Sequence, residues 1–192
     1  MPSPLPDADA HAQAAPSFDA TGFVVRALVL YALAEHQAGH AEEIRVIAQG
    51  YDFSVSDDGR GHSINKVVDG SPYLNFIYGQ LDYPFAANPG GAIQLQGIGM
   101  SLVNSLCSDL AVEVRKSEQV LRLRFSSGQL REKQVQTVGS GQTGNTVSGT
   151  IAPQLAGSPM NEARLEGWLR RVAATNPALR LSFNGSALHN GS

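Results

Sequence analysis

The sequence predicts an α+β fold, a two-layer sandwich in which helices cover one face of a mixed β-sheet. Apolar residues make up 42% of the 192 residues, which is enough to fill the core of one domain. The expected elements run helix, hairpin, glycine turn, loop, second glycine motif, helix, strands, helix and strand, an order typical of α+β proteins. We therefore expect a single domain over residues 21–186, between a disordered, proline-rich tail at 1–20 and a short tail at 187–192.

Hydrophobic periodicity places the elements along the chain. Apolar residues recur at helical spacing from Gly22 to Gly39, and Gly39 suits the C-cap of that helix. Alternating residues then predict a hairpin with strands at 43–47 and 53–56. The same rules predict a helix at 100–106, strands at 110–115 and 120–125, an amphipathic helix at 162–174, and a last strand at 179–183.

Two glycine motifs are the most informative features of the chain. Residues 57–61 read Asp-Asp-Gly-Arg-Gly and follow the hairpin. A carboxylate at a strand end accepts hydrogen bonds from amines, and a glycine lets a ligand approach the backbone. Residues 97–106 read Gly-Ile-Gly-Met-Ser-Leu-Val-Asn-Ser-Leu and open a helix, where backbone N–H groups favour phosphate. Taken singly, the two motifs also fit an ordinary turn and a tightly packed helix entry.

Together these motifs resemble the nucleotide site of the GHKL (Bergerat-fold) superfamily, and most closely its gyrase-B-type ATPase domains. The resemblance implies that Asp57 reads an adenine amino group, that Arg60 borders the base, and that Gly61 lets the backbone approach it. It also implies that Gly97 and Gly99 face phosphate oxygens.

Two further ligand-binding residues follow from the same resemblance. Glu35 matches an acidic residue of the first helix that borders the arginine of the turn. Residues 143–147, Thr-Gly-Asn-Thr-Val, are similar to a Thr-Gly-Thr segment on a central strand, whose threonine lies near the adenine-reading aspartate. Thr146 and Asn145 are the two candidates for that role, and the alternative for this segment is a simple polar turn.

The departures from the GHKL pattern bear most directly on function. In the register set by residues 38–44, Ala27 stands where these ATPases carry a water-activating Glu, and Tyr31 stands where they carry a magnesium-binding Asn. Alanine accepts no proton from water, and a phenol is a poor substitute for an amide oxygen on Mg²⁺. Residues 93–96, Ile-Gln-Leu-Gln, replace the Gly-Gly-Leu-His that precedes the second motif. We therefore expect no magnesium site and at most weak binding of adenine nucleotide.

The residues that remain predict a repurposed pocket. Asp57, His62 and Tyr31 are candidate catalytic residues, because a histidine near a carboxylate provides acid–base chemistry at neutral pH. The alternative for His62 is a solvated loop position. The first hypothesis is a pocket for a small organic molecule, with metal-independent isomerase or cyclase chemistry. The second is a pseudo-ATPase that binds nucleotide and acts through a protein partner. The third is an active ATPase with unusual catalytic residues.

Composition narrows the partners and the compartment. The formal net charge of −3 argues against nucleic-acid binding by this domain. No run of about 20 apolar residues predicts a membrane span, and the N-terminus has no signal-peptide pattern. The single cysteine, Cys107, lies among apolar residues and suits a buried, inert thiol. We expect a cytoplasmic protein with a small-molecule ligand, and either a protein partner or a homodimer is compatible with the sequence.

Overall fold

The computed structural model describes residues 18–62, 67–68, 71–72, 100–139 and 141–188. Three helices lie within these ranges, α1 (Ala20–Gln37), α3 (Met100–Leu106) and α4 (Glu162–Thr175). The strands are β1 (Glu43–Gln49), β2 (Asp52–Asp57), β3 (Val67–Val68), β4 (Ser71–Pro72), β5 (Cys107–Arg115), β6 (Gln119–Ser126), β7 (Gln129–Thr137), β8 (Gly144–Ile151), β9 (Arg180–Phe183) and β10 (Ser186–Ala187).

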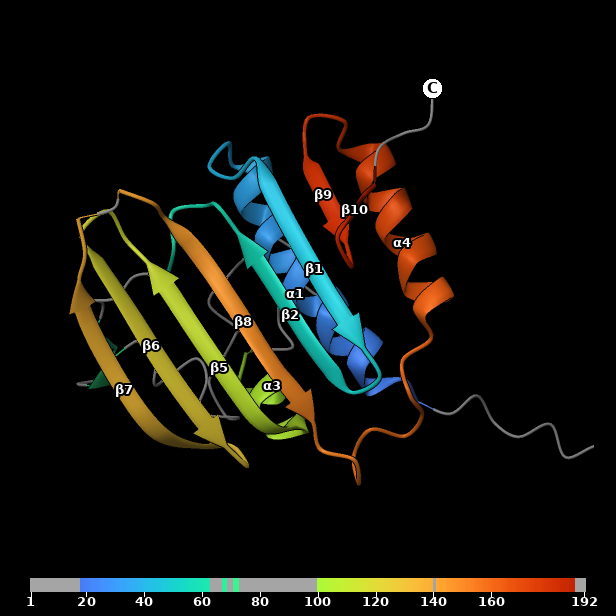
Figure 1. The fold of residues 1–192 in the computed structure, drawn as a ribbon, viewed down its shortest axis with the longest axis horizontal. Helices are drawn as coiled ribbons and strands as arrows, with labels where there is room; N and C mark the ends of the chain where they lie inside the picture. Colours follow the sequence, from blue (N-terminus) through green and yellow to red (C-terminus); the bar gives the residue numbers. More distant parts are fainter. Residues whose placement is uncertain (1–17, 63–66, 69–70, 73–99, 140, 189–192) are drawn as a thin grey trace, which may run out of the picture.

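Eight of these strands form one mixed sheet, in the order β10-β9-β1-β2-β8-β5-β6-β7 (Figure 1). Neighbouring strands are antiparallel except β1 and β9, which are parallel. Strand β8 is inserted between β2 and β5, so the chain returns to the centre of the sheet after forming the β5–β6–β7 edge. This return brings residues 143–147 next to the turn that follows β2.

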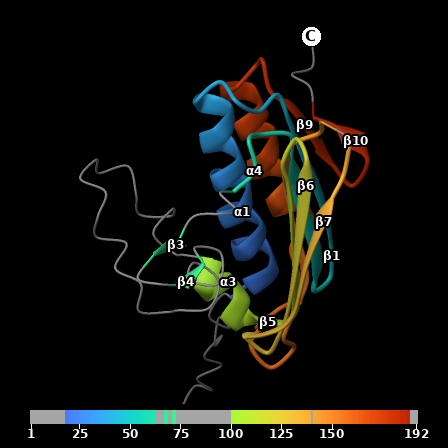
Figure 2. The same ribbon diagram turned by 90° about the vertical axis from the view of Figure 1, so that its left-hand side faces the viewer.

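The helices pack on one face of the sheet, and the other face carries no helix among the described residues (Figure 2). Strand β1 shows the reason, because Ile44, Val46 and Ala48 are buried while the residues between them are more exposed. Helix α1 buries Val24, Val25 and their neighbours against this apolar face. The predicted two-layer α+β sandwich with a mixed sheet is confirmed.

The ends of α1 follow from local chemistry. Asp19 is the N-cap, and its Oδ1 accepts a hydrogen bond of 2.7 Å from the backbone N–H of Gly22. At the other end Gly39 has a φ of +79°, the left-handed conformation that commonly terminates helices. The helix therefore begins two residues before the predicted start and stops just ahead of the predicted cap.

Two further expectations are tested by the described residues. No described helix has both the length and the apolar character needed to span a membrane. Cys107 is buried, and this burial, with a smaller contribution from Asp109, raises the pKa of its thiol to about 12. The thiol is therefore protonated and inert at neutral pH, as predicted.

Candidate functional site

The turn after β2 positions the predicted key carboxylate. Asp57 is the last residue of β2, and its Oδ1 accepts a hydrogen bond of 2.9 Å from the backbone N–H of Gly59. Its Oδ2 accepts one of 3.3 Å from Nδ2 of Asn145 on β8. Gly61 has a φ of +72°, and a Cβ there would come within 2.6 Å of the carbonyl oxygen of Arg115. Only glycine fits at this point of the turn.

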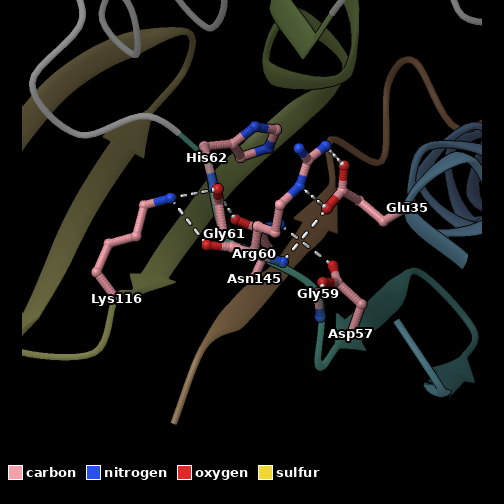
Figure 3. A network of polar contacts seen from close by, with 8 residues as sticks. All are labelled: Glu35, Asp57, Gly59, Arg60, Gly61, His62, Lys116 and Asn145. Carbon is pink, nitrogen blue, oxygen red and sulfur yellow. Dashed lines mark hydrogen bonds and ion pairs between the residues drawn. The ribbon is translucent and has the colours of Figure 1, made fainter. Parts of the chain in front are cut away.

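Asn145 connects both ends of the turn (Figure 3). Besides contacting Asp57, its Oδ1 accepts a hydrogen bond of 2.9 Å from the backbone N–H of His62. Successive side chains of a strand point to opposite faces of the sheet, so the next residue, Thr146, lies on the other face from Asn145. There its Oγ1 accepts a hydrogen bond of 3.0 Å from Arg115. The structure thus separates the two residues that the sequence left open: Asn145 lies beside Asp57, and Thr146 does not.

Glu35 and Arg60 form a two-pronged ion pair, as the resemblance implies. Arg60 Nη2 lies 2.7 Å from Oε1 of Glu35, and Arg60 Nε lies 3.1 Å from Oε2. The Arg60 backbone N–H also donates to Oε2, at 3.3 Å. The side-chain hydrogen bond from Arg60 is the main reason why the pKa of Glu35 lies below its usual value. Both oxygens of Glu35 are therefore committed to Arg60.

Two basic residues at the end of β5 hold the turn from the other side, and neither was predicted from the sequence. Lys116 Nζ donates to the carbonyl oxygens of Arg60, at 2.8 Å, and Gly61, at 2.7 Å (Figure 3). Arg115 Nη2 donates to the carbonyl oxygen of Asp57 at 3.3 Å. These contacts depend on which strands pair, so no local sequence pattern predicts them.

A cavity of about 250 Å³ lies between α1 and this turn. Its described lining contains five predicted site residues, namely Tyr31, Glu35, Asp57, Gly61 and His62. Most of the remaining wall is apolar, and it is formed by Leu28, Ala32, Ala34, Val55, Met100 and Val147, with Asn145 as the other polar group. Arg60 reaches this site through its ion pair with Glu35, and Thr146 does not contribute to the lining. Gly97 and Gly99 lie outside the described residues.

The electrostatics of the cavity correct one expectation. Burial lowers the pKa of His62 to about 4, and the Lys116 ammonium acts in the same direction while Glu35 opposes it. Burial also raises the pKa of Asp57, partly offset by its hydrogen bonds from Gly59 and Asn145. The prediction that His62 titrates near neutral pH does not fit this environment. His62 is neutral at pH 7, and it lines a cavity rather than a solvated loop.

Helix α1 carries the two residues, Ala27 and Tyr31, at which the sequence departs from the GHKL pattern. Ala27, Tyr31 and Glu35 are spaced four residues apart and so lie along one stripe of the helix. Ala27 is buried, with 2% of its surface exposed, and Tyr31 lines the cavity. Within the described residues no group of three or more His, Cys, Asp or Glu side chains is arranged to hold a metal ion.

Comparison with known proteins gives both sequence relatives and structural neighbours. No protein-family model matches the chain. It is 30% identical over 164 residues to the B subunit of DNA gyrase from Thermus thermophilus, a match that covers 79% of this chain and 25% of that protein. It is 31% identical over 163 residues to the B subunit of DNA topoisomerase 4 from Escherichia coli, a match that covers 78% of this chain and 25% of that one. The chain thus spans about a quarter of the length of these relatives.

Two solved structures are similar over most of the chain. One is the ATP-binding domain of topoisomerase IV from Francisella tularensis in complex with a small-molecule inhibitor. It has a TM-score of 0.73 at 20% identity and covers 87% of this chain and 85% of that one. The other is the 43K ATPase domain of Thermus thermophilus gyrase B in complex with an aminocoumarin. It has a TM-score of 0.71 at 26% identity and covers 87% of this chain and 45% of that one.

Proposed function

The chain has the GHKL fold of the gyrase B type, and we propose that its cavity beside Asp57 binds a small organic molecule without ATP hydrolysis and without magnesium. The observation that carries this proposal is the cavity itself. It has mainly apolar walls and a small number of placed polar groups, which is the usual composition of a small-molecule site. Its volume of about 250 Å³ lies just below the usual range of about 300–1,000 Å³ for such sites, so the ligand is expected to be small.

The polar groups define what the ligand must offer. The Asp57 carboxylate is held by Gly59 and Asn145, so its orientation is set before a ligand arrives. A carboxylate only accepts hydrogen bonds, so the ligand must present an N–H or O–H group to it. Burial of Asp57 strengthens such a bond, because little water competes for the carboxylate.

The absence of hydrolysis rests on α1. Its one acidic residue, Glu35, has both oxygens engaged by Arg60 and is therefore not a free general base. The positions one and two turns earlier hold Tyr31 and Ala27, which supply neither a carboxylate nor an amide oxygen. Activation of water and coordination of a hard metal ion both need such groups.

The catalytic form of this proposal is proton transfer within the bound molecule, as in an isomerisation or a cyclisation. Such a reaction has no net oxidation and needs no cofactor. Asp57, whose pKa is raised by burial, would accept a proton from the ligand, the neutral imidazole of His62 would orient the ligand by a hydrogen bond, and the Tyr31 phenol would donate a proton. Figure 3 shows the His62 ring and the Asp57 carboxylate apart from each other, with Asn145 bonded to both residues, so the two act on different parts of the ligand.

A second candidate function is binding of adenine nucleotide without hydrolysis, coupled to a protein partner. Asp57, Gly61 and the Glu35–Arg60 pair favour it, because the relatives that share this fold include ATP-binding domains. The two candidate functions differ in whether the phosphate groups of ATP and a Mg²⁺ ion contribute to the binding affinity.

Calorimetric titration with adenosine, ATP, and ATP plus Mg²⁺ separates the two candidates. The proposal predicts weak binding that is similar for adenosine and ATP and is unchanged by Mg²⁺. Tight ATP binding that strengthens sharply with Mg²⁺ would instead support the second candidate, and Mg²⁺-dependent turnover of ATP would refute both.

Asp57→Asn tests the role of the carboxylate with any ligand that these titrations or a screen of small molecules provide. Loss of a hydrogen bond to a charged group costs about 1.5–3 kcal/mol, so affinity should fall by a factor of about 10 to 100. Asp58→Asn is the matched control, because Oδ1 of Asp58 accepts from the backbone N–H groups of Glu42 and Glu43 outside the cavity lining. Equal affinity in wild type and Asp57→Asn would remove Asp57 from the site.

A further inference from the structure

Three arginines surround the only tryptophan of the chain where α1 meets α4. Arg164, Trp168 and Arg171 follow one another at spacings of four and three residues and therefore share one face of α4. Arg26 comes from α1, and its Cζ lies 5.7 Å from the centre of the Trp168 ring. This separation is within the range of a cation–π contact.

This cluster lies apart from the cavity beside Asp57. An α-helix turns by about 100° per residue, which places Arg26 on the opposite side of α1 from Leu28, Tyr31 and Glu35. Figure 1 shows α4 on the side of α1 away from α3 and β5. The two regions can therefore be altered independently.

The charges of this cluster are not neutralised by described residues. None of the three arginine side chains forms a salt bridge within the described part of the chain, whereas Arg170 on the same helix is paired with Glu166 at 2.6 Å. The Asp19 carboxylate is a counter-charge that acts on Arg26, but its two oxygens accept hydrogen bonds from the backbone N–H groups of Gly22 and Asn161.

Arg26 shows the effect of this arrangement. Its Nε is buried and faces no hydrogen-bond acceptor from the described residues. The pKa of Arg26 is lowered mainly by burial and also by repulsion from Arg164 and Arg171. The Asp19 carboxylate raises it, but not enough to cancel these effects. An unsatisfied buried donor beside like charges costs free energy, and an anion bound at the exposed side chains of Arg164 and Arg171 would relieve the repulsion part of that cost.

We propose that Arg26, Arg164 and Arg171, together with Trp168, form a binding site for an oxyanion, a phosphate or carboxylate group presented by a partner molecule. Guanidinium groups match the paired oxygens of both anions in a two-pronged geometry. The Trp168 ring supplies an apolar surface beside them, and tryptophan with arginine is the combination most enriched at the energetic centres of interfaces. This surface goes beyond the proposed ligand cavity and does not depend on it.

The fluorescence of Trp168 reports on this site directly, because the chain contains no other tryptophan. The full chain is titrated with inorganic phosphate and, separately, with a hexaglutamate peptide, at ionic strength held constant with NaCl. We expect a saturable change in emission with at least one probe. Saturation by phosphate alone assigns a phosphate-bearing partner, and saturation by the peptide assigns an acidic protein segment.

The double variant Arg164→Gln/Arg171→Gln should weaken this binding at least tenfold. Both side chains are exposed, so the variant is expected to fold, and its thermal unfolding is measured alongside. Arg170→Gln is the matched control and should bind as the wild type does, since Arg170 is already paired with Glu166. The proposal is overturned if neither probe gives saturation at constant ionic strength, or if the double variant binds as tightly as the wild type.

Discussion

The two walls of the cavity are held by different interactions. On the sheet side, Asp57, Asn145 and the turn between them are cross-linked by hydrogen bonds, and Lys116 ties the turn to the end of β5. On the helix side, the wall is mainly apolar, and its polar members are Tyr31 and Glu35. The sheet wall is held in place by hydrogen bonds between strands and the turn, whereas the helix wall packs against it mainly through apolar contacts.

This difference determines what each wall reveals about function. Asp57 and Asn145 are hydrogen-bonded to each other across β2 and β8, so this contact supports the sheet whatever the cavity binds. Their presence is therefore weak evidence for any one ligand. Ala27 and Tyr31 are the positions of α1 at which the sequence departs from the GHKL pattern, so they bear on the chemistry of the cavity rather than on the contact between β2 and β8. The helix wall therefore bears more directly on the proposed function than the sheet wall does.

The substitution Gly144→Ala should disrupt the sheet wall, and we expect it to have the largest effect on the free energy of unfolding. Gly144 has a φ of +132°, and a Cβ there would collide with the carbonyl oxygen of Asp57. Strained backbone of this kind costs about 1–3 kcal/mol before the collision is counted. We expect a loss of at least about 3 kcal/mol in the free energy of unfolding, measured by chemical denaturation.

Gly139→Ala is the control for this prediction. Gly139 has no atom within 4 Å of the position of a Cβ, so the substitution should leave stability nearly unchanged. If Gly144→Ala proves as stable as Gly139→Ala, the close contact between β8 and the turn is wrong, and with it the rigid sheet wall.

His62→Gln tests how dry the cavity is, and its effect depends on pH. Because the pKa of His62 in the folded state is about 4, below its value of 6.5 in the unfolded chain, its contribution to stability is present above pH 6.5. That contribution is lost as the pH falls towards 4, and the pKa difference corresponds to about 3 kcal/mol. The variant should flatten the fall in unfolding free energy between pH 6.5 and 4.

The comparison for His62 is His40→Gln, which alters an exposed histidine after α1. This variant removes a histidine outside the cavity lining and so controls for the loss of an imidazole elsewhere in the chain. A profile for His62→Gln identical to that of the wild type would mean that His62 is solvated, and the cavity wall beside it would then be wet rather than dry.

The elements with strong apolar patterns were predictable from the sequence. Helix α3 has the predicted bounds, and α1, α4 and the β1–β2 hairpin differ by a few residues at most. Strand β7 gave no signal because all of its residues are exposed, so it has no alternating face. Strand β8 is rich in Gly, Ser and Thr, and it is a strand because β2 and β5 pair with both of its edges. Only the family resemblance pointed to a strand there.

The candidate site was predictable where one motif carries it. Asp57, Gly61 and the Glu35–Arg60 pair follow from the motif 57–61 and its spacing from α1. The identity of Asn145 required the register of β8, since one residue decides which face of a sheet a side chain occupies. Lys116 depended on tertiary pairing, and the pKa of His62 depended on burial, neither of which the sequence encodes locally.

Glu35→Gln gives the smallest expected effect and bears most directly on the helix wall. The pair with Arg60 is largely exposed, with 59% of the Arg60 side chain accessible, so its contribution to stability is small. We expect the melting temperature to fall by no more than a few degrees, and Arg60→Gln should behave alike. Since Glu35 is engaged by Arg60, ATP turnover should stay at background in both wild type and variant, measured by phosphate release with Mg²⁺. Turnover in the wild type that Glu35→Gln abolishes would make Glu35 the water-activating base, and the helix wall would then be catalytic.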